Sequence, residues 1–136
     1  MRWLLAAARA MTGAACSQNP APDLEIILAD KPPTTLSDYG LFADRSARVP
    51  SAGVVKYDLI NPLFSDHADK HRYVFVPNGE RIDYTEEDVL AYPVGTVLVK
   101  SFAYGERYLE TRLLIHKSDG WEALPYVWNA DQTEAT

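Results

Sequence analysis

Three histidines are the side chains whose types and spacing most directly suggest chemistry. His67 and His71 are four residues apart, so on a helix their imidazoles would share one face, as in a metal site. Asp66 and Asp69 add oxygen ligands beside them. His116 would complete a set of three protein ligands if the fold brought it close, whereas two neighbouring histidines alone do not make a metal site. Because the HExxH motif is absent, structural or solvated histidines are favoured over a metal site.

A carboxylate and a guanidinium form the second candidate group. Glu110 and Arg112 are two residues apart in an alternating segment, so they share one face of a strand. A solvated ion pair is the simpler interpretation, and the alternative is an acid/base carboxylate that an arginine holds in a cleft. Asp66 and Arg112 are the polar candidates for binding a ligand.

Aromatic side chains are frequent in the second half of the chain, and two tryptophans bracket its last apolar segment. Trp121 and Trp128 could together form a platform on which a sugar ring stacks. Large aromatic residues more often fill the core of a small β domain with their polar tips at its edge, and that interpretation is favoured. Trp121 and Trp128 therefore stay candidates for a carbohydrate site as the third choice, after a binding module and a metal site.

Composition and motifs exclude several functional classes. The formal net charge is −6, which argues against binding nucleic acid. The order of residues matches no Ser-His-Asp triad, phosphate-binding glycine loop or nucleotide fingerprint, so no catalytic residue is assigned and an enzyme is disfavoured. The single cysteine leaves no disulfide within the chain and no CxxCH haem attachment, so no cofactor is expected in this chain.

The first sixteen residues, MRWLLAAARAMTGAAC, are typical of an export signal. Arg2 supplies the positive start, and a run of small apolar residues leads to Cys16. The pattern predicts a lipoprotein signal over residues 1–16, with Cys16 as the lipidated residue; ordinary secretory cleavage or a buried N-terminal helix are the alternatives. The next segment, 17–35, contains four prolines and is predicted to be a tether. Within it, residues 24–28 (LEIIL) are an apolar island that would add a strand or dock on the core.

Hydrophobic periodicity predicts a mainly β domain over residues 36–136, a small antiparallel sandwich or half-barrel with one or two short helices. Residues 36–47 are the candidate short helix. Strands are expected at 54–59, 73–76, 80–84, 96–102, 107–116 and 121–128. Pro125 removes a hydrogen-bond donor, which places the last strand at an edge or makes it bulged.

Alternation in the segment RYLETRLLIH assigns its side chains to two faces. One face, expected to be buried, would carry Leu109, Thr111, Leu113 and Ile115. The other, expected to face solvent, would carry Tyr108, Glu110, Arg112, Leu114 and His116.

Four separated blocks carry a resemblance to a known family: LSDYGLF (36–42), YDLINPLFSDHADKHR (57–72), YPVGTVLVKSFAY (92–104) and ETRLLIHKSDGWEALPYVWN (110–129). Together they resemble the bacterial exported di-haem-cytochrome-like proteins. In that family the β-rich region precedes a segment with a CxxCH haem site. The resemblance implies that this chain is a haem-free N-terminal region, that a haem-c part lies downstream of residue 136, and that its partners are periplasmic redox proteins. It carries no catalytic residue onto this chain.

The sequence thus predicts an exported, lipid-anchored β domain on the periplasmic face of a bacterial membrane. Its expected role is a binding or scaffolding module of a periplasmic electron-transfer protein. A metal-dependent enzyme or carrier and a carbohydrate-binding module are the alternatives.

Overall fold

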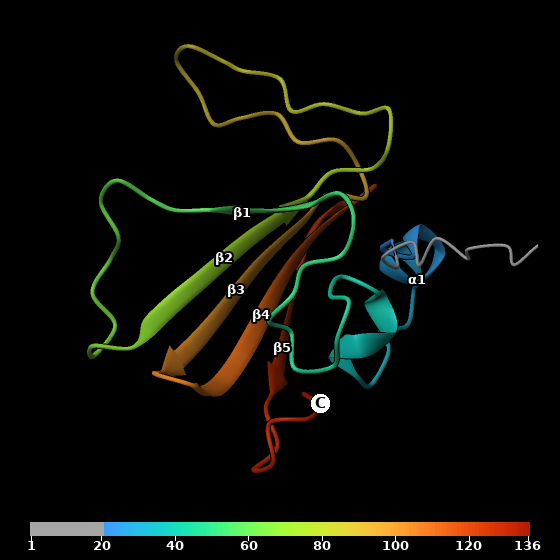
Figure 1. Cartoon of the computed structure of the whole chain (residues 1–136). Helices are drawn as coiled ribbons and strands as arrows, with labels where there is room; N and C mark the ends of the chain where they lie inside the picture. The colour runs from blue at the N-terminus through green and yellow to red at the C-terminus, as the bar shows by residue number, and fades with distance from the viewer. Residues whose placement is uncertain (1–20) are drawn as a thin grey trace, which may run out of the picture.

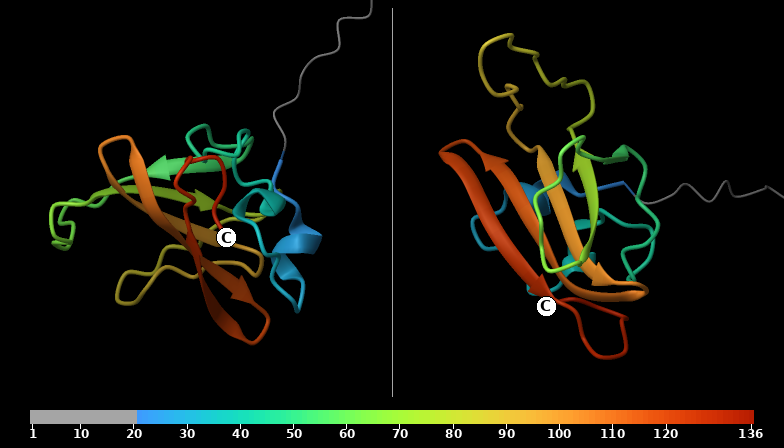
Figure 2. Two further views of the ribbon diagram at one scale, coloured as in Figure 1. Left: turned by 90° about the horizontal axis from the view of Figure 1, so that it is seen from below. Right: turned by 90° about the vertical axis from the view of Figure 1, so that its left-hand side faces the viewer.

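The computed structural model describes residues 21–136, so the predicted leader and Cys16 lie outside the described residues. It contains one five-stranded antiparallel sheet whose strands follow one another in chain order (Figure 1). The strands are β1 (Val54–Tyr57), β2 (Asp69–Phe75), β3 (Val97–Tyr104), β4 (Arg107–Lys117) and β5 (Gly120–Val127). The sheet is twisted and curved (Figure 2). The prediction of a mainly β, antiparallel domain is confirmed.

The two hairpins at the end of the sheet are built on turns that favour glycine. Tyr104 pairs with Arg107 across the first turn, where Gly105 has φ +57°. Lys117 pairs with Gly120, which has φ +133°, across the second. Residues with a Cβ rarely adopt such positive φ values, so the glycines fix where each strand reverses. Pro125 lies in β5, an edge strand of the sheet, as predicted.

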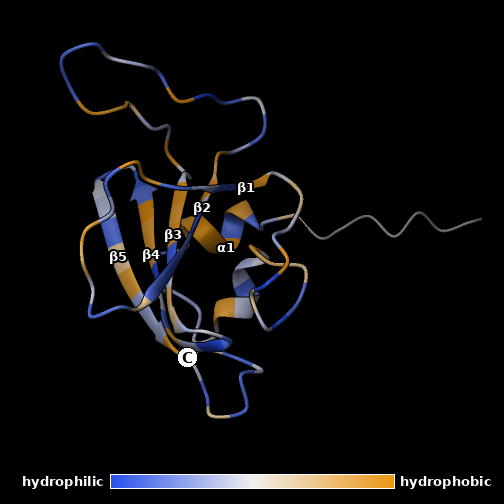
Figure 3. Cartoon of the chain, turned by 60° about the vertical axis from the view of Figure 1, so that its left-hand side comes forward, coloured by the Kyte–Doolittle hydropathy of each residue, from blue (hydrophilic) through white to orange (hydrophobic). Residues whose placement is uncertain are grey.

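Two short helical segments form a layer over one face of the sheet (Figures 1 and 3). The first is α1 (Leu24–Leu28), capped by the Asp23 carboxylate, which accepts from the Glu25 amide at 3.0 Å. The second is η1 (Leu36–Tyr39), a 3₁₀ turn. Ile27 is only 1% exposed, so the apolar island of the Pro-rich segment docks on the core.

The predicted helix over residues 36–47 is wrong in its length. Only η1 is helical, and it ends at Gly40, which has φ +65° in the left-handed region. The next residues leave the helix and form an isolated bridge between Phe42 and Pro50. Packing of Leu41 into the core determines the backbone conformation after η1, because this side chain is fully buried although it lies outside any helix.

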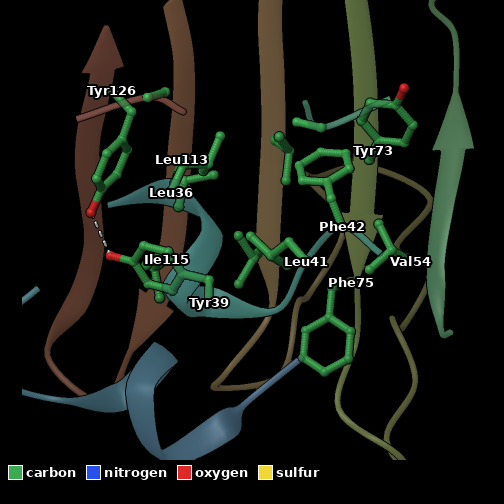
Figure 4. Packing of buried hydrophobic residues seen from close by; sticks show 14 of the residues in the cluster. Leu36, Tyr39, Leu41, Phe42, Val54, Tyr73, Phe75, Leu113, Ile115 and Tyr126 are labelled. Atoms are coloured by element: carbon green, nitrogen blue, oxygen red, sulfur yellow. Dashed lines mark hydrogen bonds between the residues drawn. The ribbon is translucent and has the colours of Figure 1, made fainter. Parts of the chain in front are cut away.

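The core fills the space between this helical layer and β2–β5 (Figure 4). At its centre the Tyr39 ring meets the Tyr126 ring edge-on, with the hydroxyls 2.9 Å apart. The Tyr126 hydroxyl also lies 2.9 Å from the Pro33 carbonyl, to which it donates. Both polar tips therefore have partners inside an apolar environment, as buried tyrosines require.

A hydrogen-bonded polar group lies at one end of the core. Ser101 of β3 and Thr111 of β4 are fully buried, and their hydroxyl oxygens are 2.7 Å apart. The indole Nε1 of Trp128 donates to the same Thr111 oxygen at 3.0 Å. Because unpartnered buried polar atoms are costly, these three residues stabilise one another's burial.

The predicted faces of the fourth strand are wrong at its beginning. Glu110 pairs with Phe102, but Tyr108 pairs with Ala103, so Leu109 is an extra residue that forms a β-bulge. Tyr108 is therefore buried, at 4% exposure, and Leu109 is 40% exposed. From Glu110 onward the predicted alternation is confirmed.

The predicted return strand at residues 80–84 is absent. Residues 76–96 instead form a long loop that projects beyond the end of the sheet and contains one isolated bridge, between Asp83 and Ala91 (Figure 1). The Asn78-Gly79 turn forms, with Gly79 at φ +85°, but the residues after it are mostly polar and exposed. Tyr84 of this segment is 79% exposed, so burial of its side chain does not hold the segment in the sheet. In residues 21–136 no helix is long and apolar enough to cross a membrane.

We expect the domain to lose stability at alkaline pH through Tyr39 and Tyr126. Burial, together with the Tyr126 hydroxyl, raises the pKa of Tyr39 far above its ordinary value, and burial raises the pKa of Tyr126. Each of these tyrosines has a higher pKa in the folded protein than in the unfolded chain, so its contribution to the free energy of unfolding is unchanged below pH about 10. As the pH rises further, the unfolded chain loses the proton first, and the free energy of unfolding falls by up to about 1.4 kcal/mol per pH unit for each tyrosine. Urea unfolding between pH 8 and 11 checks this, and Tyr39→Phe should lower the alkaline slope.

Candidate functional site

The face of the sheet turned away from α1 and η1, called here the outer face, carries two parallel rows of side chains. Register places Val55, Val74, Leu98, Leu114 and Ala123 directly opposite one another across all five strands. This set, the apolar row, includes side chains that are well exposed, Val55 at 59% and Leu114 at 37%. No element in residues 21–136 covers these two positions as the helical layer covers the core face.

The next row along the strands is positively charged. Arg72 of β2 lies opposite Lys100 of β3, which lies opposite Arg112 of β4. These three residues are called the cationic row. Like charges directly opposite each other in a sheet are destabilising, so this arrangement has an electrostatic cost. Lys70 adds a fourth cation on the same face of β2, two residues before Arg72 and opposite Phe102 of β3.

Carboxylates compensate the two ends of the cationic row but not its middle. The Arg72 guanidinium is 3.8 Å from the Asp58 carboxylate, and Arg112 pairs with Glu110. Within the described part of the chain Lys100 forms no ion pair. The Lys100 ammonium lies 4.7 Å from the centre of the Phe102 ring, and the Arg112 guanidinium carbon lies 5.0 Å from it.

The neighbours of Lys100 change its acidity. Burial, followed by the positive charges of Arg72, Lys70 and Arg112, lowers the pKa of the Lys100 ammonium from its ordinary value, and only Glu110 opposes them. The protonated form of Lys100 is therefore less stable, relative to the neutral amine, in the folded protein than in water.

Residues 58–68, the loop between β1 and β2, extend over part of this face (Figure 2). The Tyr104 hydroxyl donates to the Asp66 carbonyl at 3.0 Å, and Lys70 donates to the Leu63 carbonyl. A hollow of about 350 Å³ lies between the loop and the strands, and both Asp66 and Arg112 line it. These two predicted ligand-binding residues are therefore brought together, with Glu110 beside them.

The structure does not bring the three histidines together. His71 lies on the core side of β2, with its ring 5.4 Å from that of Tyr108. His116 lies on the outer face, stacked on Trp121 at 4.6 Å. The two imidazoles thus project from opposite faces of the sheet, because their positions differ in strand phase. His67 lies in the loop with φ +64°, against Phe64. In residues 21–136 no three His, Cys, Asp or Glu side chains converge on a metal-sized site.

The two tryptophans occupy different environments. Trp128 is 7% exposed and belongs to the core, where its ring lies 5.4 Å from that of Tyr108. Trp121 is 41% exposed on the outer face, between the His116 ring and the edge of Tyr92. Trp121 lies near the start of β5 and Trp128 directly after its end, about 23 Å apart at ~3.3 Å per residue, so they do not form one platform.

Sequence reasoning did not single out Arg72, Lys100 or Phe102. Arg72 and Lys100 are far apart along the chain, and only the strand register places these two cations side by side. The available signal was their strand phase: Lys100 alternates with the buried residues Val99 and Ser101.

No protein-family model, curated protein or solved structure was found to match the chain. The resemblance to di-haem-cytochrome-like proteins, and the roles that it implies, therefore remain predictions.

We expect Lys100→Met to stabilise the protein by about 0.2–1 kcal/mol, because methionine keeps the apolar stem and removes the repulsion from both neighbours. Urea unfolding at low ionic strength measures the gain, which should shrink when salt screens the charges. Lys56→Met, an exposed lysine of β1 outside the cationic row, is the control. A destabilised Lys100→Met protein, or a gain that is the same at high salt, would contradict the expectation.

Proposed function

We propose that this chain is an exported, lipid-anchored binding module, the haem-free part of a periplasmic electron-transfer protein, and that its outer face docks on the redox partner. The observation that carries the proposal is the outer face, which the loop of residues 58–68 covers only in part and which combines an apolar row, a cationic row and aromatic rings. Large exposed apolar surfaces on small proteins commonly mark interaction sites, and aromatic and arginine side chains are enriched in them.

The loop formed by residues 58–68 extends this surface. Ile60 is 98% exposed, Leu63 82% and Phe64 74%. Leu63 and Phe64 lie beside the cationic row, because they line a hollow together with Arg72 and Lys70. Exposure of such large apolar side chains to water is unfavourable in free energy. Their exposure therefore supports the proposal of a partner that covers the loop and the sheet together.

The anchor comes from the sequence alone. The leader that ends at Cys16 supports lipidation, which would hold the domain at the periplasmic side of a membrane. A lipoprotein carries more than one acyl chain, and two chains anchor a protein stably. Fractionation of cells that express Cys16→Ser checks this: the protein should move from the membrane to the soluble fraction.

Site-specific photo-cross-linking tests the docking. A cross-linking residue at position 114, on the outer face, should capture a haem-staining protein in the chain's native cells. The same residue at position 25, exposed on α1 in the helical layer, is the control and should capture none. Equal capture from both positions, or products without haem from position 114, would exclude the proposal.

Carbohydrate binding is the second candidate, and the exposure of Trp121 favours it. This indole lines an open hollow of about 600 Å³ together with Asp30, Asp119 and Glu122. An exposed ring beside carboxylates has the chemistry of a sugar subsite. Tryptophan fluorescence that glycans leave unchanged, in wild type and in Trp121→Ala alike, would eliminate it.

A further inference from the structure

We propose that the outer face contains a binding site for a carboxylate that carries an apolar group, with Lys100 at the centre of the anion subsite and the apolar row beside it. This inference deepens the proposed function, on which it rests, because it names the chemical group that the partner presents to this face. Arg112 is the one residue of this site that the sequence already suggested for ligand binding.

The first support is an uncompensated charge. Four cations, Lys70, Arg72, Lys100 and Arg112, lie together on this face, and Asp58 and Glu110 pair with the two arginines. Asp66 and Asp69 line the adjoining hollows, but in residues 21–136 neither lysine forms an ion pair. The Lys100 ammonium is therefore the cation of the row that an incoming anion can pair with.

The second support is spacing. Neighbouring strands lie about 4.8 Å apart, so the three residues of the cationic row span roughly 10 Å. The two oxygens of one carboxylate can therefore contact Lys100 and one arginine of the row at the same time. Lysine supplies a point charge and arginine a planar fork, which together fit a carboxylate.

The third support is partial burial. Arg72 is 6% exposed, and residues of the loop 58–68 line a hollow of about 480 Å³ with it. Its carboxylate partner, Asp58, is itself exposed and 3.8 Å away. Lys100 lies between this hollow and the one that Arg112 lines. A charge interacts more strongly with an anion where water is excluded, so an anion that reaches from Lys100 to Arg72 would gain more than one at an open surface.

The apolar neighbours select among anions. Val74, Leu98 and Leu114 lie in the adjacent row, and Phe102 lies on the other side of Lys100. A carboxylate with an aliphatic or aromatic body would bury that body on these side chains. Inorganic phosphate has no apolar part and would leave them exposed.

Titration of the full chain with octanoate, followed by NMR, tests the site. Octanoate should bind with saturation and shift the amide signals of β2, β3 and β4. Lys100→Met should weaken this binding at least tenfold, whereas Lys100→Arg should keep it and Lys56→Met should leave it unchanged. Inorganic phosphate should bind at least tenfold more weakly than octanoate. Because Lys100→Met is expected to be more stable than wild type, its loss of binding cannot come from unfolding.

Three outcomes would overturn the inference: absence of octanoate binding, octanoate binding that Lys100→Met leaves intact, and phosphate binding as tight as that of octanoate. The cross-linking from position 114 is read separately. Capture of a haem protein without octanoate binding would remove only the carboxylate site. Octanoate binding without capture would remove only the redox partner.

Discussion

Trp128→Ala is expected to lower the free energy of unfolding by about 3–5 kcal/mol, the usual cost of truncating a buried aromatic residue. The indole is almost fully buried against Tyr108, and its Nε1 donates to Thr111. Alanine would leave a cavity and would also take one partner from a buried hydroxyl. Urea unfolding followed by circular dichroism measures the change.

Trp121→Ala is the matched control, because the same substitution is made at an exposed ring near the start of β5, whereas Trp128 directly follows the end of that strand. Its cost should be below about 1 kcal/mol, in the range of surface substitutions that lose some packing. Similar losses for the two variants would contradict the assignment of Trp128 to the core and of Trp121 to the outer face.

Ile27→Ala is expected to cost about 2–5 kcal/mol, as for other fully buried aliphatic side chains. Ile27 is the buried residue of α1, and it belongs to the same core cluster as Leu41 and Ile115. A loss of this size would show that the Pro-rich segment completes the domain. Unfolding of the full chain in urea gives the value.

Leu28→Ala serves as the comparison, since the neighbouring leucine of the same helix is 36% exposed whereas Ile27 is 1% exposed. Helix propensity is similar in the two variants, so the difference between them isolates burial. If Ile27→Ala were as mild as Leu28→Ala, α1 would not be part of the folded core.

The strands that the sequence predicted well are those whose information is local. The last three were placed to within about two residues, because alternation defines each strand and a glycine fixes each turn. The bulge was missed, since Leu109 and Tyr108 are both compatible with burial and only pairing with β3 decides between them. The helix expected at residues 36–47 failed because burial of Leu41 overrides local propensity.

Of the site residues suggested by the sequence, only a pair from a loop and a strand lies together. Asp66 and Arg112 do line one hollow. The histidines are separated by the sheet itself, because a difference of strand phase sends His71 and His116 to opposite faces. The cationic row is a product of register among three strands, and a single chain read in order does not contain that register.

The bulge in β4 has a consequence for how this hairpin can vary in evolution. Loss of one residue elsewhere in the strand would exchange inward and outward side chains beyond that point. Loss of Leu109 would leave Glu110 opposite Phe102 and Tyr108 opposite Ala103. The carbonyl of Leu109 accepts from the Trp128 amide at 3.0 Å, so one backbone hydrogen bond would be given up. Related chains one residue shorter in this hairpin should therefore carry their gap at position 109.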